Sequence, residues 1–384
     1  MPKENYLKKE KTIVTPDKHP TVDLRSPVVR AYLDAKSLDI KAKLLKKYSL
    51  LKLDYQNIKF VWRVEDTNRP FLVTFSLNKD FSDSFSYIVY EEILEAHFAF
   101  EAGRKYYWKI TNYNASKVFY VSWFKTKDTP GNFLDIQNCN NIRDIGGWPT
   151  LDGKRVKRGL IYRGSRLNEW ELGENRSQYE REGYLTITQQ LKWKSEIDLR
   201  YKDCGGQDRC LWDESAPYLK RSIGCYVEMF PDIIWPGPRT HYTHNDMPYM
   251  IRDIFNFLAD ESHLPCYFHC NGGADRTGTI AWILNALLGV NEEHLFEDYE
   301  LTSFTVWNRR WRANIINNKF VGEEMVNEEI FWVVMGPLPR LMMEKFGTGD
   351  GKLSSATENY LISYCGVEKE TINKFKKIML EDYN

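Results

Sequence analysis

Short runs of β-branched and aromatic residues, separated by turn residues, fill the chain between residues 58 and 125. The runs are IKFVWRVE (58–65), FLVTFSL (71–77), SYIVY (86–90), AHFAF (96–100), KYYWKIT (105–111) and KVFYVSWFK (117–125). Such spacing is typical of strands in an antiparallel sandwich. The chain of 384 residues is long enough for two domains. We therefore expect an all-β sandwich domain over residues 26–128, with short helices near 27–47, after a loose polar arm at 1–25.

Beyond the turn-rich stretch TKDTPGN (126–132), strands and helices alternate. Strands are predicted at 159–163, 195–200 and 265–269, and helices at 183–193, 247–260 and 276–288. Because parallel strands need crossover connections, this alternation predicts an α/β domain over 132–384, with a parallel sheet covered by helices. Ligands of such sheets bind beyond the carboxyl ends of the strands. His269, Cys270 and the triplet 198–200 fall there.

The composition of the chain limits the kinds of partner and the cellular compartment that we expect for it. Lysine plus arginine and aspartate plus glutamate each count 53, so the net charge is zero and we expect no nucleic-acid partner. No apolar segment approaches the roughly 20 residues of a membrane span, and the N-terminus lacks the apolar core of a signal peptide. The seven cysteines contain no C-x-x-C pair, which favours free thiols over disulfides or zinc. We expect a cytoplasmic protein, or a secreted or periplasmic one if a signal peptide has been removed.

The loop between His269 and Arg276 has the residues of a phosphate site. Gly272 and Gly273 permit a sharp turn, and successive amides at a helix N-terminus bind anions of phosphate size. Arg276 can add bidentate contacts to two phosphate oxygens. The same positive field lowers the pKa of a thiol below its usual value of about 8.5. Cys270 is therefore expected to be a thiolate nucleophile beneath a bound phosphate.

The segment HCNGGADRTG (269–278) resembles the signature of cysteine-dependent phosphatases, and its Asp-Arg-Thr-Gly ending resembles the bacterial tyrosine phosphatase family. NIRDIGG (141–147), DGKRVKRGLIYRGSRL (152–167), DLR (198–200) and ENYLISYCGVEKETINKFKKIMLE (358–381) are similar to further motifs of that family. The likeness covers residues 138 to 381. The first 130 residues lie outside it and, around Leu94, Gly103, Tyr107 and Trp108, resemble a fibronectin type III strand and turn.

This resemblance implies roles for individual residues. Cys270 would be the nucleophile, Arg276 the phosphate clamp and Asp275 the general acid, with Asp232 and Asp246 as alternative acids. Substrate-binding positions would be Asn271, Gly272, Gly273, Ala274, Thr277, Arg143, Asp144 and Arg200. Supporting positions would be His269, Asp198 and Gly278.

Other roles stay open for some of these residues. Arg143, Asp144 and Arg200 fit structural ion pairs equally well, and Asp275 fits a carboxylate that braces the loop against an arginine. His241 and His244 with Asp246 lack a clear third ligand, so no metal or other cofactor is expected.

The residues favour a phosphomonoester hydrolase that acts through a cysteinyl-phosphate intermediate. Within that class, the resemblance to the family favours a protein-tyrosine phosphatase. Its partner would be a phosphotyrosine protein or a small phosphomonoester; inositol phosphates or phosphoinositides are the alternative. A sulfurtransferase or arsenate reductase fits less well because of the motif at 141–147. A phospho-binding module without turnover fits less well because Cys270, Asp275 and Arg276 are present. Ala274 stands where many relatives have lysine, which favours phosphotyrosine over multiply phosphorylated inositols. Nothing in the sandwich region indicates its partner.

Overall fold

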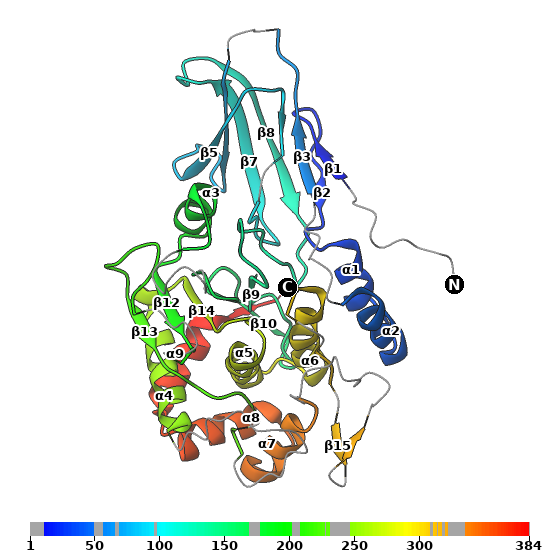
Figure 1. The fold of residues 1–384 in the computed structure, drawn as a ribbon, viewed down its shortest axis with the longest axis vertical. Coiled ribbons are helices and arrows are strands. Elements are labelled where there is room, and N and C mark those ends of the chain that lie inside the picture. Colours follow the sequence, from blue (N-terminus) through cyan, green and yellow to red (C-terminus); the bar gives the residue numbers. More distant parts are fainter. Residues whose placement is uncertain are drawn as a thin grey trace.

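The computed structural model describes residues 11–49, 57–65, 69–95, 98–168, 177–201, 208–226, 228–230, 246–307, 310–312, 314–316, 319–321 and 335–383. The molecule is elongated, with a strand-rich N-terminal region at one end and a mixed α/β region at the other (Figure 1). Among the described residues, no helix is both long and apolar enough to cross a membrane.

Two sheets make up the strand-rich region. The first contains β1 (Lys11–Val14), β3 (Asn57–Val61) and β6 (Ile93–Leu94); the second contains β2 (Thr21–Val22), β8 (Val118–Thr126), β7 (Lys105–Asn112), β4 (Phe71–Ser76) and β5 (Ser84–Val89). Alternate residues of β7 are buried, as a strand with one face on a core requires. Phe60, Phe75, Trp108 and Phe124 come from both sheets and share one aromatic core. The fibronectin type III likeness stays a prediction.

Two expectations for this region are wrong. The arm predicted at 1–25 is not loose from Lys11 onward, because β1 pairs with β3 in parallel and β2 pairs with β8; residues 1–10 lie outside the described part. The β-branched run TIV at 12–14 is too short to stand out in a polar segment. The strand predicted at 96–100 is also not seen over 98–100, where Phe100 is buried in the core without strand pairing.

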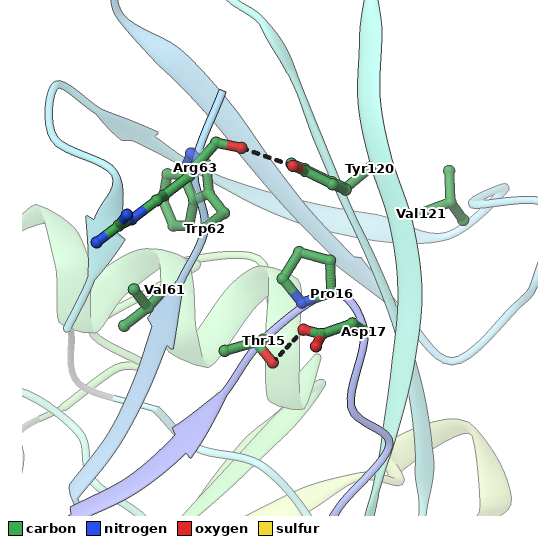
Figure 2. Close-up of a pocket in the computed structure, with 8 residues that line it drawn as sticks. All are labelled: Thr15, Pro16, Asp17, Val61, Trp62, Arg63, Tyr120 and Val121. Carbon is green, nitrogen blue, oxygen red and sulfur yellow. Dashed lines mark hydrogen bonds between the residues drawn. The ribbon is translucent and has the colours of Figure 1, made fainter. Parts of the chain in front are cut away.

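A cavity of about 510 Å³ opens in the strand-rich region between the end of β3 and β8 (Figure 2). The Tyr120 hydroxyl donates a hydrogen bond to the Arg63 carbonyl oxygen at 2.6 Å beside it. The cavity is lined by Thr15, Pro16, Asp17, Val61, Trp62, Arg63, Tyr120 and Val121. It therefore belongs to the strand-rich region alone.

Helices α1 (Pro27–Leu33) and α2 (Leu38–Tyr48) do not join the aromatic core of the strands. They lie beside α6 (Glu292–Leu301) in the α/β region (Figure 1). Their buried face packs on Leu301 and Phe304, together with Phe133. Residues 27–48 are thus part of the α/β core, and the predicted sandwich boundary at residue 26 is wrong for them.

A five-stranded, mainly parallel sheet forms the centre of the α/β region, as predicted. Its order is β13 (Tyr218–Lys220), β12 (Ser195–Asp198), β14 (Cys266–His269), β11 (Ile161–Gly164) and β9 (Arg143–Asp144). The first four strands are parallel, and β9 is antiparallel to β11. Two further pairs are antiparallel, β10 (Lys154–Val156) with β17 (Leu380–Asp382) and β15 (Asn314–Ile316) with β16 (Lys319–Val321).

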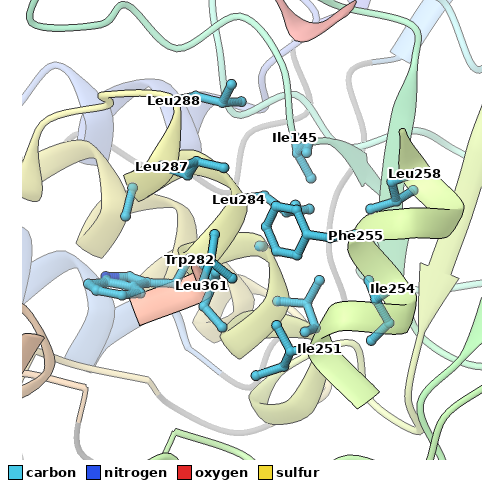
Figure 3. Packing of buried hydrophobic residues seen from close by; sticks show 14 of the residues in the cluster. Ile145, Ile251, Ile254, Phe255, Leu258, Trp282, Leu284, Leu287, Leu288 and Leu361 are labelled. Carbon is cyan, nitrogen blue, oxygen red and sulfur yellow. The ribbon is translucent and has the colours of Figure 1, made fainter. Parts of the chain in front are cut away.

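Helix α5 (Asp275–Leu287) is the most deeply buried helix of the α/β region that the structure describes. Every residue from Thr277 to Leu287 is buried, as its all-round apolar sequence requires. Leu284 and Leu287 lie among Ile251, Ile254 and Phe255 of α4 (Met247–Leu258) (Figure 3). Other α-helices in the described part of this region are α3 (Arg181–Leu185), α7 (Leu338–Phe346), α8 (Leu353–Asn359) and α9 (Lys369–Met379). Packing on every side fixes the N-terminus of α5, where the phosphate loop ends.

Polar contacts join the two regions closely. The Tyr162 hydroxyl of β11 donates to Glu101 Oε1 at 2.7 Å, and Arg155 of β10 forms an ion pair with Asp128. The α/β region therefore contacts both Glu101 of the strand-rich region and Asp128 of the turn-rich stretch at 126–132.

Candidate active site

Strand β14 delivers Cys270 to the carboxyl edge of the sheet. It is the middle strand, paired with β11 on one side and β12 on the other. The amide of Leu199 donates to the carbonyl oxygen of His269 at 2.9 Å, which ties the end of β14 to the end of β12. Cys270 follows at once and is only 3% exposed.

The two glycines of the loop are needed for different reasons. Gly273 has a φ of +67°, and a Cβ there would lie 2.3 Å from the carbonyl carbon and oxygen of Gly164. A side chain would thus meet both backbone strain and a backbone clash. At Gly272, a Cβ would lie 2.9 Å from the indole of Trp307. The sequence predicted the backbone requirement at Gly273, but not the Trp307 ring that packs against Gly272.

Three donors hold the loop from behind. Asn141 Nδ2 donates to the Gly272 carbonyl at 2.8 Å, and an Arg163 NH2 group donates to the Gly273 carbonyl at 2.7 Å. The amide of Arg166 donates to the carbonyl of Asn271 at 3.0 Å. Because the C=O and N–H of a trans peptide point in opposite directions, the amides of residues 272–274 face the other side of the loop. That arrangement is an anion-binding nest.

The thiol of Cys270 is the one that this environment acidifies. Burial would raise the pKa of this thiol, but the charge of Arg276 and the neighbouring hydroxyl and amide of Thr277 outweigh burial, so the pKa lies below its usual value. Elsewhere burial dominates and raises the pKa of Cys139, Cys266 and Cys365 to about 12. Cys270 is therefore the thiol suited to nucleophilic attack near neutral pH.

Arg276 lies in the first turn of α5, directly after the loop. Its guanidinium lies over the ring of Tyr201, 5.5 Å from the centroid. Arg166 lies likewise over the ring of Trp307, also at 5.5 Å. An aromatic ring therefore lies against each of the two arginine side chains, Arg276 and Arg166.

Asp275 is engaged in an ion pair. Both its carboxylate oxygens accept hydrogen bonds from Arg310, each at 2.9 Å. Arg310 is 4% exposed, whereas Asp275 is 26% exposed. This is the bracing arrangement that the sequence left open. Asp246 is exposed at the start of α4, whereas Asp232, His241 and His244 lie outside the described residues.

The predicted substrate contact of Arg143 is wrong, because its guanidinium is fully buried and bonded within the protein. Its Nε donates to Asp298 Oδ1 at 2.9 Å, and a further nitrogen donates to Asn141 Oδ1 at 2.5 Å. Arg163 binds the other oxygen of Asp298. Burial first, and then the charge of Arg163, lower the pKa of Arg143 to about 10. This cluster braces the loop through Asn141 and Arg163.

Asp144 is likewise not placed as a substrate contact. It accepts hydrogen bonds from the amides of Gly146 and Gly159 at 2.7 and 2.6 Å and lines a small cavity with Glu101 and Tyr162 at the boundary of the two regions. Burial raises its pKa to about 6.

Arg200 is fully buried in a bidentate pair with Asp198, at 2.8 and 2.9 Å, and also donates to Asn168. Arg200 therefore forms a structural ion pair, as Arg143 does, because acceptors within the protein bind its guanidinium. The charge of Arg200 still affects a neighbouring arginine. The pKa of Arg166 is lowered, first by the burial of Arg166 and then by the charge of Arg200.

The residues predicted to support the loop, His269, Asp198 and Gly278, are all buried. His269 Nε2 bonds with Glu196 Oε1 at 2.7 Å, and its Nδ1 lies 3.1 Å from the Cys270 carbonyl oxygen. Gly278 is buried in α5 beside Arg163. Ala274 is buried at the N-cap of α5. Sequence reasoning missed Arg310, Trp307, Asp298 and Glu196; the run of tryptophan and arginine at 307–312 is the signal that was available for the first two.

Parts of the sequence are similar to known proteins. The tyrosine phosphatase family model matches residues 134–203 and 240–381. A protein of Cupriavidus necator with the provisional name tyrosine-protein phosphatase is 26% identical over 178 residues, 43% of this chain and 61% of that protein. The chain thus spans less than two thirds of this curated relative. The core catalytic domain of the PP-IP phosphatase Siw14 from S. cerevisiae is 16% identical, with a TM-score of 0.25 over 41% of this chain and 79% of that one. A TM-score this low supports no argument.

Proposed function

Because the chain belongs to the tyrosine phosphatase family, we propose that it hydrolyses phosphomonoesters through a cysteinyl-phosphate intermediate. The main support is the acidified thiol of Cys270, which is buried beneath a loop whose amides converge and is followed by Arg276. Burial alone would raise the pKa of this thiol and make it inert, as it does for Cys139, Cys266 and Cys365. Positive charge gathered at one buried thiol is what a nucleophile for a phosphate dianion needs.

In the first step, Cys270 Sγ attacks phosphorus, a sulfur–phosphorus bond forms, and the ester P–O bond breaks. The leaving oxygen takes a proton from an acid. The loop amides and Arg276 stabilise the charge on the equatorial oxygens. In the second step, the deprotonated acid takes a proton from water, the water oxygen bonds to phosphorus, and the sulfur–phosphorus bond breaks. Inorganic phosphate is released and the Cys270 thiolate is restored, stabilised by the charge of Arg276.

Phosphotyrosine is the substrate that the surroundings of the loop favour. Trp307 packs on Gly272, and Tyr201 lies under Arg276, so aromatic rings are available beside the phosphate site for a phenyl group. Ala274 adds no cation to the loop. A multiply phosphorylated inositol would need further positive charges, and Arg143 and Arg200 are already paired internally.

The nucleophile is tested with Cys270→Ser on a panel of phosphotyrosine peptide, phosphoserine peptide and inositol hexakisphosphate. We expect phosphate release from the phosphotyrosine peptide to fall to background, while binding of inorganic phosphate and the melting temperature are retained. Cys266→Ala is the matched control, since that thiol lies on the same strand and burial raises its pKa. Equal turnover by the serine variant would refute the mechanism, and a tenfold preference for the inositol substrate would refute the substrate class.

A second comparison identifies the acid. Asp275→Asn and Asp246→Asn are assayed on aryl phosphates with good and poor leaving groups. Loss of the general acid slows poor leaving groups most and removes the basic limb of the pH profile. We expect that signature for Asp275→Asn; if Asp246→Asn shows it instead, Asp275 is only a brace.

A further inference from the structure

One segment, residues 302–307 with 310–312, contacts the phosphate loop at two points. Trp307 packs its indole against Gly272 early in the loop. Arg310 binds both carboxylate oxygens of Asp275 where the loop becomes α5. The loop is therefore held from outside the strand and helix that flank it.

Arg310 is itself fixed from several directions. Its amide donates to Ser303 Oγ at 2.6 Å, and the Ser303 hydroxyl donates back to the Arg310 carbonyl at 2.9 Å. The guanidinium also donates to the Trp307 carbonyl at 3.1 Å. Such contacts restrict the guanidinium to the position that meets Asp275.

Two residues further on, Arg312 ties the same segment to α6. Its Nε and one NH2 group donate to the two oxygens of Glu300 at 2.8 and 2.9 Å, and its amide donates to Glu300 at 2.9 Å. Its remaining nitrogen binds Glu293. Glu300 is fully buried, so the pair is shielded from water.

The N-terminal helices reach the same carboxylates. The Tyr32 hydroxyl of α1 donates to Glu300, and Lys41 Nζ of α2 binds Glu293 and Glu297, each at 2.5 Å. Tyr32 also packs edge-on against Phe304, with ring centroids 5.4 Å apart. Helices outside the residues matched by the family model thus bond to the element that precedes Arg310.

Building on the proposed function, we propose that Arg310 is a positioning residue for the phosphate loop, and that Tyr32 and Lys41 of α1 and α2 hold the segment that contains it. The catalytic unit of this chain then includes residues 27–48. Arg310 acts through Asp275 and does not contact substrate.

The charges around Asp275 predict how its contact with Arg310 affects the pKa of the Cys270 thiol. Asp275 raises the pKa of Cys270, against Arg276 and Thr277, which lower it. Asp275 faces Arg310 and the paired hydroxyls of Tyr226 and Tyr299, which lie 2.5 Å apart. The guanidinium of Arg310 therefore offsets a negative charge that would otherwise make the thiolate less stable.

The first experiment measures the pH dependence of Cys270 alkylation by iodoacetamide, followed by peptide mapping, in Arg310→Met and Arg310→Lys. This readout does not require turnover, so it stays informative if the proposed activity fails. We expect the midpoint to rise by roughly half a unit to one unit in Arg310→Met and to stay near wild type in Arg310→Lys. On a phosphotyrosine peptide, kcat should fall roughly tenfold to a hundredfold in both variants, because lysine cannot reproduce the bidentate geometry.

The second experiment tests the helices with Tyr32→Phe and Lys41→Met. Lys43→Met is the matched control, because Lys43 lies on the same helix in an exposed pair with Asp39. We expect kcat to fall by about two- to tenfold in the first two variants, with KM little changed, and no change in the control. Melting temperatures show whether each variant is folded at the assay temperature.

Three results would overturn the proposal. The first is folded Arg310→Met with wild-type kcat and an unchanged alkylation midpoint. The second is a loss of kcat in Lys43→Met as large as in Lys41→Met. The third is lower melting temperatures in Tyr32→Phe and Lys41→Met with full kcat, which would make the helices structural only.

Discussion

Replacing Gly273 with alanine tests whether the phosphate loop is fixed by its contact with β11. The backbone there has a φ of +67°, and a Cβ would lie 2.3 Å from Gly164 and 2.8 Å from the amide nitrogen of Ser165. A positive φ costs a residue with a Cβ roughly 1–2 kcal/mol, and forcing a group into a packed site adds about 1–3 kcal/mol. Gly273→Ala should therefore lower the free energy of unfolding by roughly 2–5 kcal/mol.

Gly153→Ala separates the two contributions. Gly153 has a φ of +81°, and nothing lies within 4 Å of its Cβ position, so only the backbone cost of about 1–2 kcal/mol applies. The assay is urea unfolding of both variants, together with the dissociation constant for inorganic phosphate by calorimetry. Only Gly273→Ala should lose phosphate binding, because the backbone must shift away from Gly164. If both variants lose the same stability and both bind phosphate normally, the loop adapts easily and the reasoning fails.

Two further predictions concern buried charges. Arg143→Met should lower the free energy of unfolding, measured in urea, by roughly 3–5 kcal/mol, because Asp298 stays buried with one partner fewer. The control is Arg340→Met, which removes an exposed pair with Glu344. It should change the free energy of unfolding by less than about 1 kcal/mol. The pKa of Asp144 is raised to about 6, so its contribution to stability is present below about pH 4 and is lost as the pH rises to about 6. The unfolding free energy of wild type minus that of Asp144→Asn should therefore fall by roughly 2–3 kcal/mol over that range; a flat difference would contradict the raised pKa.

Local patterns predicted the elements that hold the nucleophile. The apolar run before Cys270 and the apolar helix after Arg276 are β14 and α5, because a fully apolar strand and helix can only be buried. The glycine at 273 was predictable for a different reason, because a tight loop needs a residue with a positive φ and glycine adopts one most easily.

Partners far apart in the sequence were not predictable. Asp275 and Arg310 are separated by 35 positions, and no periodicity links them. Arg143 was read as a substrate contact because arginine in a motif near a phosphate site suits that role. Its burial beside Asp298 depends on how α6 packs against the sheet, which a single stretch of sequence does not contain.

The placement of α1 and α2 shows why segments that are neighbours in the sequence do not always belong to the same domain. Their sequence is amphipathic, and an amphipathic helix specifies that one face is buried but not against what. Here the buried face meets Leu301 and Phe304, and a buried lysine, Lys41, meets two carboxylates of α6. A buried ion pair is a poor source of stability but fixes geometry, because misplacing either partner leaves a charge without compensation. The contact between α2 and α6 is therefore suited to set the position of the segment that follows α6, and that segment contains Arg310, which binds Asp275.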